Sequence, residues 1–517
     1  MRHTVLVLRA VVALVLMILF FTLALAVSAG LLYGAYELGA FTIGHVRGRG
    51  IIFLLLVAGG MGFGGLTVLW SILPRIDKFV PPGPELSDAE QPALFKEIRR
   101  VAAMVGQQPP AHVYLAPDVN AFVTERGGWM GIGSRRVMGV GLGLMNLLTV
   151  SELRAVLAHE FGHFDGGDTK LGPWIYKTRG AIIRTVQNLF RAGAASADSD
   201  LQTVGLVLTL IGKPFHWFAK LYLRITHAIS RAQEYSADRL AATTQGAQAL
   251  VEGLKKAHRG GLAFGVYLRT ELAPLLGQKR QPPLGEGFRR FLTAEVVAEG
   301  LTKAEAEELA EGKQDPYDTH PPLRERIRNV EALGASGVKD DPRPAVELLA
   351  DVPALEAKLC AAWTEGATLT PIRWEESAAA HLPGWKEAQA NASRGLQGIT
   401  PLTLPVGVGV LRSVAEKVLQ QPVGQVPDDD LRDWAIGLYA GALSALLMEH
   451  GFTPRSGPGE PFRFSRGDVA LEPYTLVRHY LRGELKFEEW SAQWTAAGLE
   501  HALVAPAREK DARAAAP

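Results

Sequence analysis

The chain has 517 residues, which is enough for two or three domains, and its charge is balanced, with 54 Lys and Arg against 53 Asp and Glu. Balanced charge argues against a nucleic-acid-binding protein, which normally carries a strong basic excess. The single cysteine, Cys360, excludes an internal disulfide and a cysteine-based zinc site, so any metal must be bound by histidine and carboxylate side chains.

Two uncharged apolar segments near the N-terminus predict a transmembrane helical hairpin. Residues 10–32 and 51–73 are each long enough to cross about 30 Å of hydrocarbon as a helix. In the second segment, Gly60 and Gly64 have the spacing that lets two helices approach closely. A cleaved signal peptide is the alternative for the first segment, because residues 26–29 resemble a cleavage site. The flanking basic residues favour both ends of the hairpin on the cytoplasmic side.

A soluble domain is expected to follow, over residues 81–335. Its first helix should run over 87–104, followed by short strands at 111–116 and 135–144. The second strand, "RRVMGVGLGL", fits two positions in a sheet. At a sheet edge it would offer its free backbone groups to an extended polypeptide, whereas in the sheet interior it would be fully paired.

The next predicted helix contains the sequence "HEFGH". It begins at Thr149 in a capping-box sequence, "TVSE", and the glycines at 166–167 should end it. His159 and His163 are four residues apart, so a helix places both imidazoles on one face, where they can bind one zinc ion. Glu160 lies beside them and can accept a proton from water. The alternative is a chance HExxH sequence in an ordinary helix.

Two histidines do not complete a zinc site, so a third ligand must come from elsewhere. Metzincins have a histidine six residues after the second one, but that position here is Thr169. The best candidate is Glu234 in "SRAQEYSAD", whose carboxylate would complete a two-His, one-Glu site. Asp238 shares its helical face and could orient a ligand histidine. The alternative for this pair of acids is a solvated helix surface.

Between these motifs, residues 174–229 are apolar but interrupted by charges and by Pro214. This favours helices packed beside the membrane over a third full span. A separate helix is expected from 225 to 244, and residues 334–344 have the composition of a linker.

"HEFGH" followed by "SRAQEYSAD", after a membrane hairpin, resembles the HtpX-like and type I CAAX prenyl endopeptidase family of membrane zinc metalloproteases. "NAF" (120–122), "GLMNLLTVSELRAVLAHEFGH" and "THPPLRERI" (319–327) agree in order, and the similarity covers about residues 85–335. Two departures stand out. Members commonly have two further spans between the motifs, and the CAAX enzymes have more spans than this chain shows, which argues against prenylated substrates.

The resemblance implies the roles of individual residues. The implied Zn²⁺ ligands are His159, His163 and Glu234, with Glu160 as the general base and Asp238 supporting the ligands. Asn120, His320 and Arg326 match positions along the cleft that steady the reacting carbonyl. For His320 the alternative is an ordinary surface histidine, and for Arg326 it is a structural ion-pair partner.

Together these features predict a mainly α (α+β) protein. A transmembrane hairpin in residues 1–80 should precede a zincin-type helical metalloprotease domain with a small β-sheet in 81–335. A helix-rich domain of unassigned role should occupy 345–505, before a disordered tail at 506–517. The expected partners are a polypeptide substrate, membrane-bound or misfolded, and the lipid bilayer, and not nucleic acid.

The predicted function is a membrane-anchored zinc endopeptidase in membrane protein quality control, located in a bacterial inner membrane with its catalytic domain facing the cytoplasm. The alternatives are a processing peptidase with one dedicated substrate, and a catalytically inactive membrane scaffold that binds a partner. The intact set of ligand and base residues argues against the scaffold.

Overall fold

The computed structural model describes residues 2–48, 50–73, 79–127, 133–164, 172–197, 201–311, 321–334 and 338–505. The chain divides into two compact units. The first comprises residues 1–116, 120–257 and 308–350, and the second comprises 117–119, 258–307 and 351–517. The protein is mainly helical with small sheets, as predicted.

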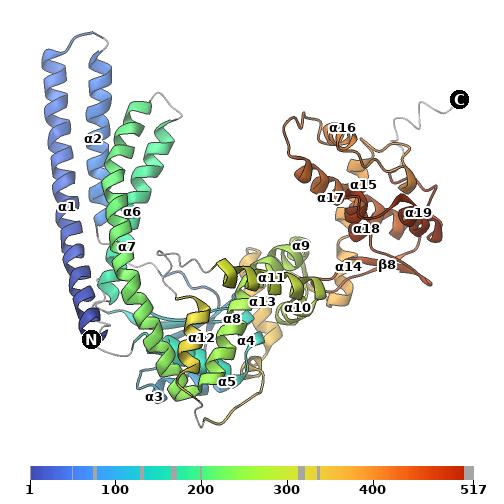
Figure 1. Ribbon diagram of the computed structural model, residues 1–517, viewed down its shortest axis with the longest axis horizontal. Coiled ribbons are helices and arrows are strands. Elements are labelled where there is room, and N and C mark those ends of the chain that lie inside the picture. The colour runs from blue at the N-terminus through green and yellow to red at the C-terminus, as the bar shows by residue number, and fades with distance from the viewer. Residues whose placement is uncertain are drawn as a thin grey trace. The chain divides into compact units, whose positions relative to one another are not determined.

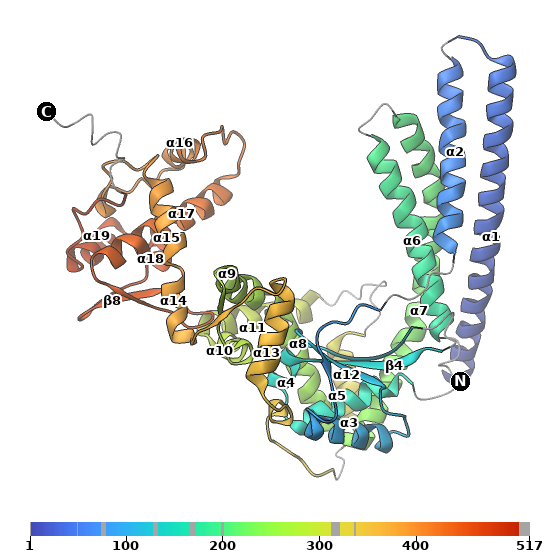
Figure 2. The same ribbon diagram turned by 180° about the vertical axis from the view of Figure 1, so that it is seen from behind.

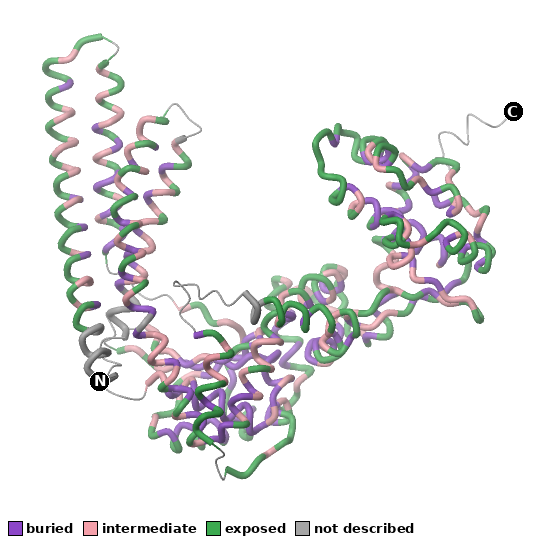
Figure 3. The backbone as a smooth tube through the Cα atoms, viewed as in Figure 1, coloured by how far each residue is buried: buried purple, intermediate pink, exposed green. Residues whose placement is uncertain are grey.

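The first unit begins with a bundle of four helical segments (Figures 1 and 2). They are α1 (Arg2–His45), α2 (Gly50–Ile72), α6 (Gly172–Ala197) and the first half of α7 (Gln202–Gln245). By length and composition, α1 and α2 are the two helices in the described residues that could cross a membrane, in agreement with the predicted hairpin. In Figure 3 this hairpin is mostly exposed or half-buried, as expected for apolar helices whose neighbour is hydrocarbon.

The helices α6 and α7 pack against the α1–α2 hairpin. The predicted close approach at the two glycines is confirmed, and α7 is the helix that approaches. A Cβ atom on Gly60 would lie 3.2 Å from Val207 Cβ, and one on Gly64 would lie 2.6 Å from Ile211 Cδ1. The hairpin therefore serves as a packing surface for the helix that also carries Glu234.

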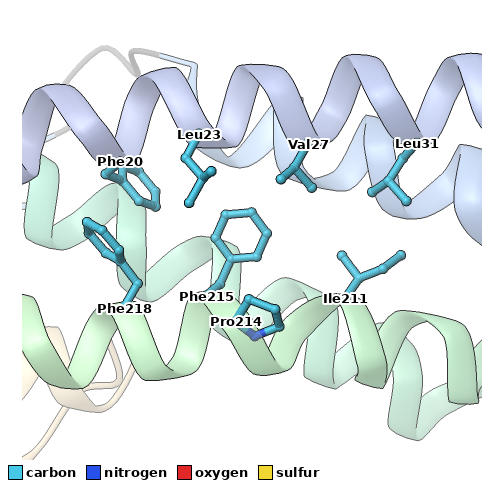
Figure 4. Close-up of a pocket in the computed structure, with 8 residues that line it drawn as sticks. All are labelled: Phe20, Leu23, Val27, Leu31, Ile211, Pro214, Phe215 and Phe218. Carbon is cyan, nitrogen blue, oxygen red and sulfur yellow. The ribbon is translucent and has the colours of Figure 1, made fainter.

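The expectation of a separate helix starting at residue 225 is wrong, because α7 is one helix of 44 residues with Pro214 inside it. Proline removes a backbone hydrogen bond, and this loss is tolerated where neighbouring helices hold the segment. Pro214 lines an apolar pocket between α1 and α7 (Figure 4), where the ring centroid of Phe20 lies 6.3 Å from that of Phe215 and 5.7 Å from that of Phe218.

A four-stranded sheet follows the hairpin, with the order β1-β2-β4-β3. The strands are β1 (Glu85–Leu86), β2 (His112–Ala116), β3 (Ala121–Arg126) and β4 (Arg135–Gly141). Since β4 pairs in parallel with β2 and antiparallel with β3, it is an interior strand. The edge-strand hypothesis for residues 135–144 is therefore wrong. The continuous burial of β4 from Val137 to Gly141 fits a strand covered on both faces.

The helices α3 (Pro92–Met104), α4 (Leu142–Leu147) and α5 (Val150–Gly162) complete the core of this part. The start of α5 is as predicted. Glu152 N donates to Thr149 Oγ1 over 3.2 Å, and Thr149 N donates to Glu152 Oε2 over 2.8 Å. The helix ends at Gly162 instead of at the glycines at 166–167, which lie outside the described residues.

The predicted linker at 334–344 is partly wrong, because its described C-terminal end is held against the start of α5. Val150 N donates to Arg343 O over 2.8 Å, and Asp341 N donates to Ser151 Oγ over 2.7 Å. These backbone groups find partners in the first unit, so this segment belongs to its structure.

The second unit is also mainly helical. Its first part contains α9 (Ala273–Gly277), α10 (Leu284–Thr293), most of α11 (Glu295–Glu311), α13 (Val352–Trp363) and a parallel pair of strands, β5 (Arg280–Gln281) and β6 (Thr370–Pro371). Its second part contains α15 (Leu382–Ala392), α16 (Val408–Leu419), α17 (Asp428–Glu449), α18 (Pro473–Leu481), α19 (Phe487–Ala496) and an antiparallel sheet of β7 (Thr453–Arg455), β8 (Arg463–Arg466) and β9 (Val469–Leu471). Trp490 and Trp494 of α19 are fully buried in the core around α17. The predicted tail at 506–517 lies outside the described residues.

Candidate metal centre

The three predicted ligands meet where α5 packs against α7. One donor atom from each of His159, His163 and Glu234 lies within 4.8 Å of the others, and the described residues contain no other such group of metal-binding side chains. His159 Nε2 is 3.5 Å from Glu234 Oε2, and His163 Nε2 is 3.7 Å from Glu234 Oε1. Ligands arranged tetrahedrally around zinc at about 2.0–2.2 Å lie roughly 3.3–3.6 Å apart. The donor set therefore fits one zinc ion.

Local helix geometry brings the two imidazoles together, and helix packing brings the carboxylate to them. The ring centroids of His159 and His163 are 4.9 Å apart, with an interplanar angle of 82°. At the next contact, a Cβ atom on Gly162 would lie 2.9 Å from Ala237 Cα. Only glycine allows α5 to approach α7 this closely, and the approach places Glu234 within reach of both rings.

Behind the ligands lies a buried ion pair. Asp238 Oδ1 accepts a hydrogen bond from His159 Nδ1 over 2.9 Å, which leaves the Nε2 atom of that ring on the side of Glu234. Arg326, from α12 (Leu323–Glu331), donates to both oxygens of Asp238, with Nε–Oδ2 at 2.9 Å and Nη2–Oδ1 at 2.6 Å. Its Nη1 atom also lies 3.5 Å from Glu234 Oε2.

Arg326 therefore lies in the position of an ion-pair partner, which was the alternative to its expected role at the reacting carbonyl. Its side chain is only 11% exposed. The role at the carbonyl stays a prediction.

The charges in this cluster shift one another's pKa values. Burial lowers the pKa of His159, but hydrogen bonds to Asp238 and Glu234 outweigh this effect and raise it to about 9. Burial raises the pKa of Asp238, but its contacts with Arg326 and His159 leave it below the usual value. The two carboxylates thus stabilise positive charge at the imidazole, and a metal ion would compete with the proton for the same lone pair.

Of the remaining predicted site residues, the structure describes Glu160 and Asn120. Glu160 follows His159 on α5 and is half-buried. Asn120 is exposed and directly precedes the edge strand β3, where its carbonyl oxygen accepts a hydrogen bond from Gly141 N over 2.8 Å. His320 lies outside the described residues, so its place in the cleft stays a prediction.

Sequence reasoning missed one contact beside the site. The Tyr235 hydroxyl donates to Glu325 Oε2 over 2.8 Å and so fastens α12 to α7 next to Arg326. Burial, with the nearby Glu325 carboxylate, raises the pKa of Tyr235 to about 12. The only sequence signal was that each residue adjoins a predicted site residue.

Known protein families and relatives match the region of the chain that contains this cluster. Peptidase family M48 matches residues 88–333. A protease HtpX homolog of Pelotomaculum thermopropionicum is 26% identical over 253 residues, which is 48% of this chain and 78% of that protein. One from Ralstonia pickettii is 27% identical over 302 residues, or 57% of this chain and 91% of that protein. Residues 88–333 are thus similar to peptidase family M48 and to HtpX proteases.

These matches support a metallopeptidase with two candidate membrane helices, and the resemblance drawn from the motifs is confirmed. Among solved structures, Ste24p of S. mikatae matches with 18% identity and a TM-score of 0.27, over 61% of this chain and 65% of that one. The family match ends at residue 333 and leaves the C-terminal region of the chain without an assigned role.

Proposed function

We propose that this protein is a membrane-anchored zinc endopeptidase in which His159, His163 and Glu234 bind the metal and Glu160 is the general base. The observation that carries the proposal is the meeting of two imidazoles and one carboxylate within 4.8 Å, from segments about 70 residues apart in the chain. Zinc, when bound, lowers the pKa of water to about 7 and polarises a carbonyl oxygen.

The protein's own residues handle the protons and the orientation of the site. Glu160 accepts the proton of the attacking water and passes it to the departing amine. Asp238 keeps the Nδ1 atom of His159 protonated, so that the Nε2 lone pair faces the site, and Arg326 holds Asp238 in place. His320, with Asn120 nearby along the cleft, is the proposed donor to the developing oxyanion.

An extended polypeptide would bind along β3. This strand contacts α5 and, among the described residues, pairs on one side only, with β4, so its other edge would offer backbone groups to a substrate strand. Pairing of this kind recognises backbone more than side chains, which suits a protease that acts on many unassembled or misfolded membrane proteins. We therefore assign the protein to membrane protein quality control.

The catalytic assignment is tested with purified full-length wild type, Glu160→Gln and a matched control, Glu331→Gln, which changes an exposed carboxylate. Casein cleavage and bound zinc are measured with and without a chelator. Glu160→Gln should bind as much zinc as the wild type and cleave about 10²–10⁴-fold more slowly, because general acid–base catalysis is worth that much. Equal, chelator-resistant cleavage in all three proteins would end the proposal.

Substrate range and orientation need separate experiments. Glu160→Gln used as a trap in native membranes should retain many different membrane proteins, whereas capture of a single species would indicate a dedicated processing peptidase. A reporter that is active only in the periplasm, fused after residue 78, should stay inactive if the catalytic domain faces the cytoplasm. An active reporter would refute that orientation.

A further inference from the structure

Of the three proposed ligands, His163 is the least constrained by the helix to which it is attached. His159 lies within the last turn of α5, but His163 is the C-cap residue, one position beyond the last helical residue. Its side chain is 31% exposed, against 7% for His159 and 7% for Glu234. Because helix ends fray, something outside α5 must keep this imidazole at its distance from Glu234.

The next residue, Phe164, is held from two sides. The guanidinium carbon of Arg136, on β4, lies 4.2 Å from the centroid of the Phe164 ring. Gln107, from the turn after α3, donates from Nε2 to the carbonyl oxygen of Phe164 over 3.2 Å. Phe164 N also donates to Phe161 O over 2.9 Å, so both the ring and the peptide of this residue are fixed.

Arg136 and Gln107 also contact each other. Arg136 Nη1 donates to Gln108 O over 2.9 Å and lies 3.4 Å from Gln107 Oε1. Among the described residues Arg136 forms no ion pair with a carboxylate, although its side chain is half-buried and this burial lowers its pKa. Its positive charge faces the Phe164 ring and the oxygens of Gln107 and Gln108 in the turn after α3, and Glu125, its partner on β3, also attracts it.

We propose that Arg136 and Gln107 are positioning residues for His163, which clamp Phe164 so that the neighbouring imidazole stays aligned with Glu234 for metal binding. The inference rests on the proposed zinc site and extends it to residues of the sheet and of the turn after α3. Among the described residues, the ring contact and hydrogen bonds of these two side chains involve Phe164 and the turn at 107–108, so they act on His163 through Phe164.

The experiment measures zinc affinity directly, by competition with a chromogenic chelator, on the full-length protein. Groups that hydrogen-bond a metal ligand directly typically contribute 10–100-fold to metal affinity. Arg136 acts one contact further away, through Phe164, so Arg136→Gln should weaken zinc binding by the lower end of this range, about 10-fold. Arg135→Gln is the matched control, because it removes the same charge from the exposed neighbouring residue of the same strand. It should leave the affinity unchanged.

Two further measurements separate alignment from general stability. The melting temperature of the metal-free protein should change little in Arg136→Gln, and the visible spectrum of the cobalt-substituted variant should differ from that of the wild type, because the coordination geometry has changed. If Arg136→Gln fails to fold, Gln107→Met and Phe164→Leu decide, since the same loss of affinity is expected for both.

Each outcome has a definite meaning. Wild-type affinity and an unaltered cobalt spectrum in the folded variants would overturn the inference and leave the proposed function standing. A folded wild type that binds no zinc would overturn the proposed function itself. Weaker zinc binding in Arg136→Gln, with the affinity of the control Arg135→Gln unchanged, supports the proposed role of Arg136 and Gln107.

Discussion

Replacing Arg154 with methionine should destabilise the peptidase domain by about 3–5 kcal/mol, because it leaves a buried carboxylate without its partner. Arg154, on the helix that carries the zinc-binding motif, donates from Nε and Nη2 to the two oxygens of Glu97 on α3, over 2.7 and 3.0 Å. The two side chains are 9% and 10% exposed. The pair holds the pKa of Glu97 below its usual value. Arg100 is a weak substitute, because it lies 3.8 Å away and is 54% exposed.

The assay is thermal unfolding of the full-length protein. For a domain of about 200 residues, 1 kcal/mol shifts the melting temperature by about 2–4 °C, so Arg154→Met should melt roughly 6–20 °C below the wild type. Arg99→Met is the control. Arg99 pairs with Asp88 over 2.6 Å, but these side chains are 49% and 53% exposed. Such surface pairs contribute about 0–1 kcal/mol, which is at most about 4 °C.

A double variant sharpens the prediction. Glu97→Leu combined with Arg154→Met removes both charges, and apolar replacement of a buried pair is often close to neutral, so much of the lost stability should return. If Arg154→Met melts within about 2 °C of the wild type, the pair does not hold α3 and α5 together as described.

Three further predictions concern other sites. Gly162→Ala should weaken zinc binding and lower the melting temperature, because the new Cβ atom would lie 2.9 Å from the Cα atom of Ala237. Overpacking of this kind costs about 1–3 kcal/mol of stability. Unchanged zinc affinity in a chelator competition would contradict this prediction. Cys360 is fully buried, and burial raises the pKa of its thiol to about 12. Iodoacetamide at pH 8 should therefore modify Cys360 only after unfolding, which mass spectrometry can follow. Rapid labelling of the native protein would contradict this burial. The hydrogen bond from Arg343 lowers the pKa of Asp341 from 3.8 to about 2, so the stability that the Asp341 carboxylate contributes is complete above about pH 4 and is lost as the pH falls through about 2. The difference in melting temperature between wild type and Asp341→Asn should therefore be present at about pH 6 and vanish near pH 2. A difference that stays constant with pH would refute the assignment.

Much of the architecture follows from signals within single helices. The two charge-free segments lie within α1 and α2, although α1 extends well beyond the predicted segment 10–32, and the capping box at Thr149 forms both of its hydrogen bonds. The proximity of the His159 and His163 rings follows from a spacing of four residues. Such features depend on neighbours a few residues away, and these neighbours are visible in the sequence.

Other features depend on segments that are distant in the chain. An apolar run such as the one in β4 suits either an interior or an edge strand, and its neighbours on both sides, β2 and β3, settle the matter. Pro214 locally disfavours a continuous helix, but packing of α7 on α1 and α2 holds the helix together. The clamp on Phe164 joins a turn after α3, a central strand and the end of α5, and no spacing in the sequence links them.

The sequence by itself determined which residues could bind a metal and which segments could lie in a membrane, because composition and helical periodicity act over a few residues. Only the tertiary structure decided that Glu234 reaches both imidazoles, that Arg326 pairs with Asp238, and that Arg136 lies against Phe164. These contacts depend on how closely α5 approaches α7, and that distance is set by the packing of Gly162 against Ala237.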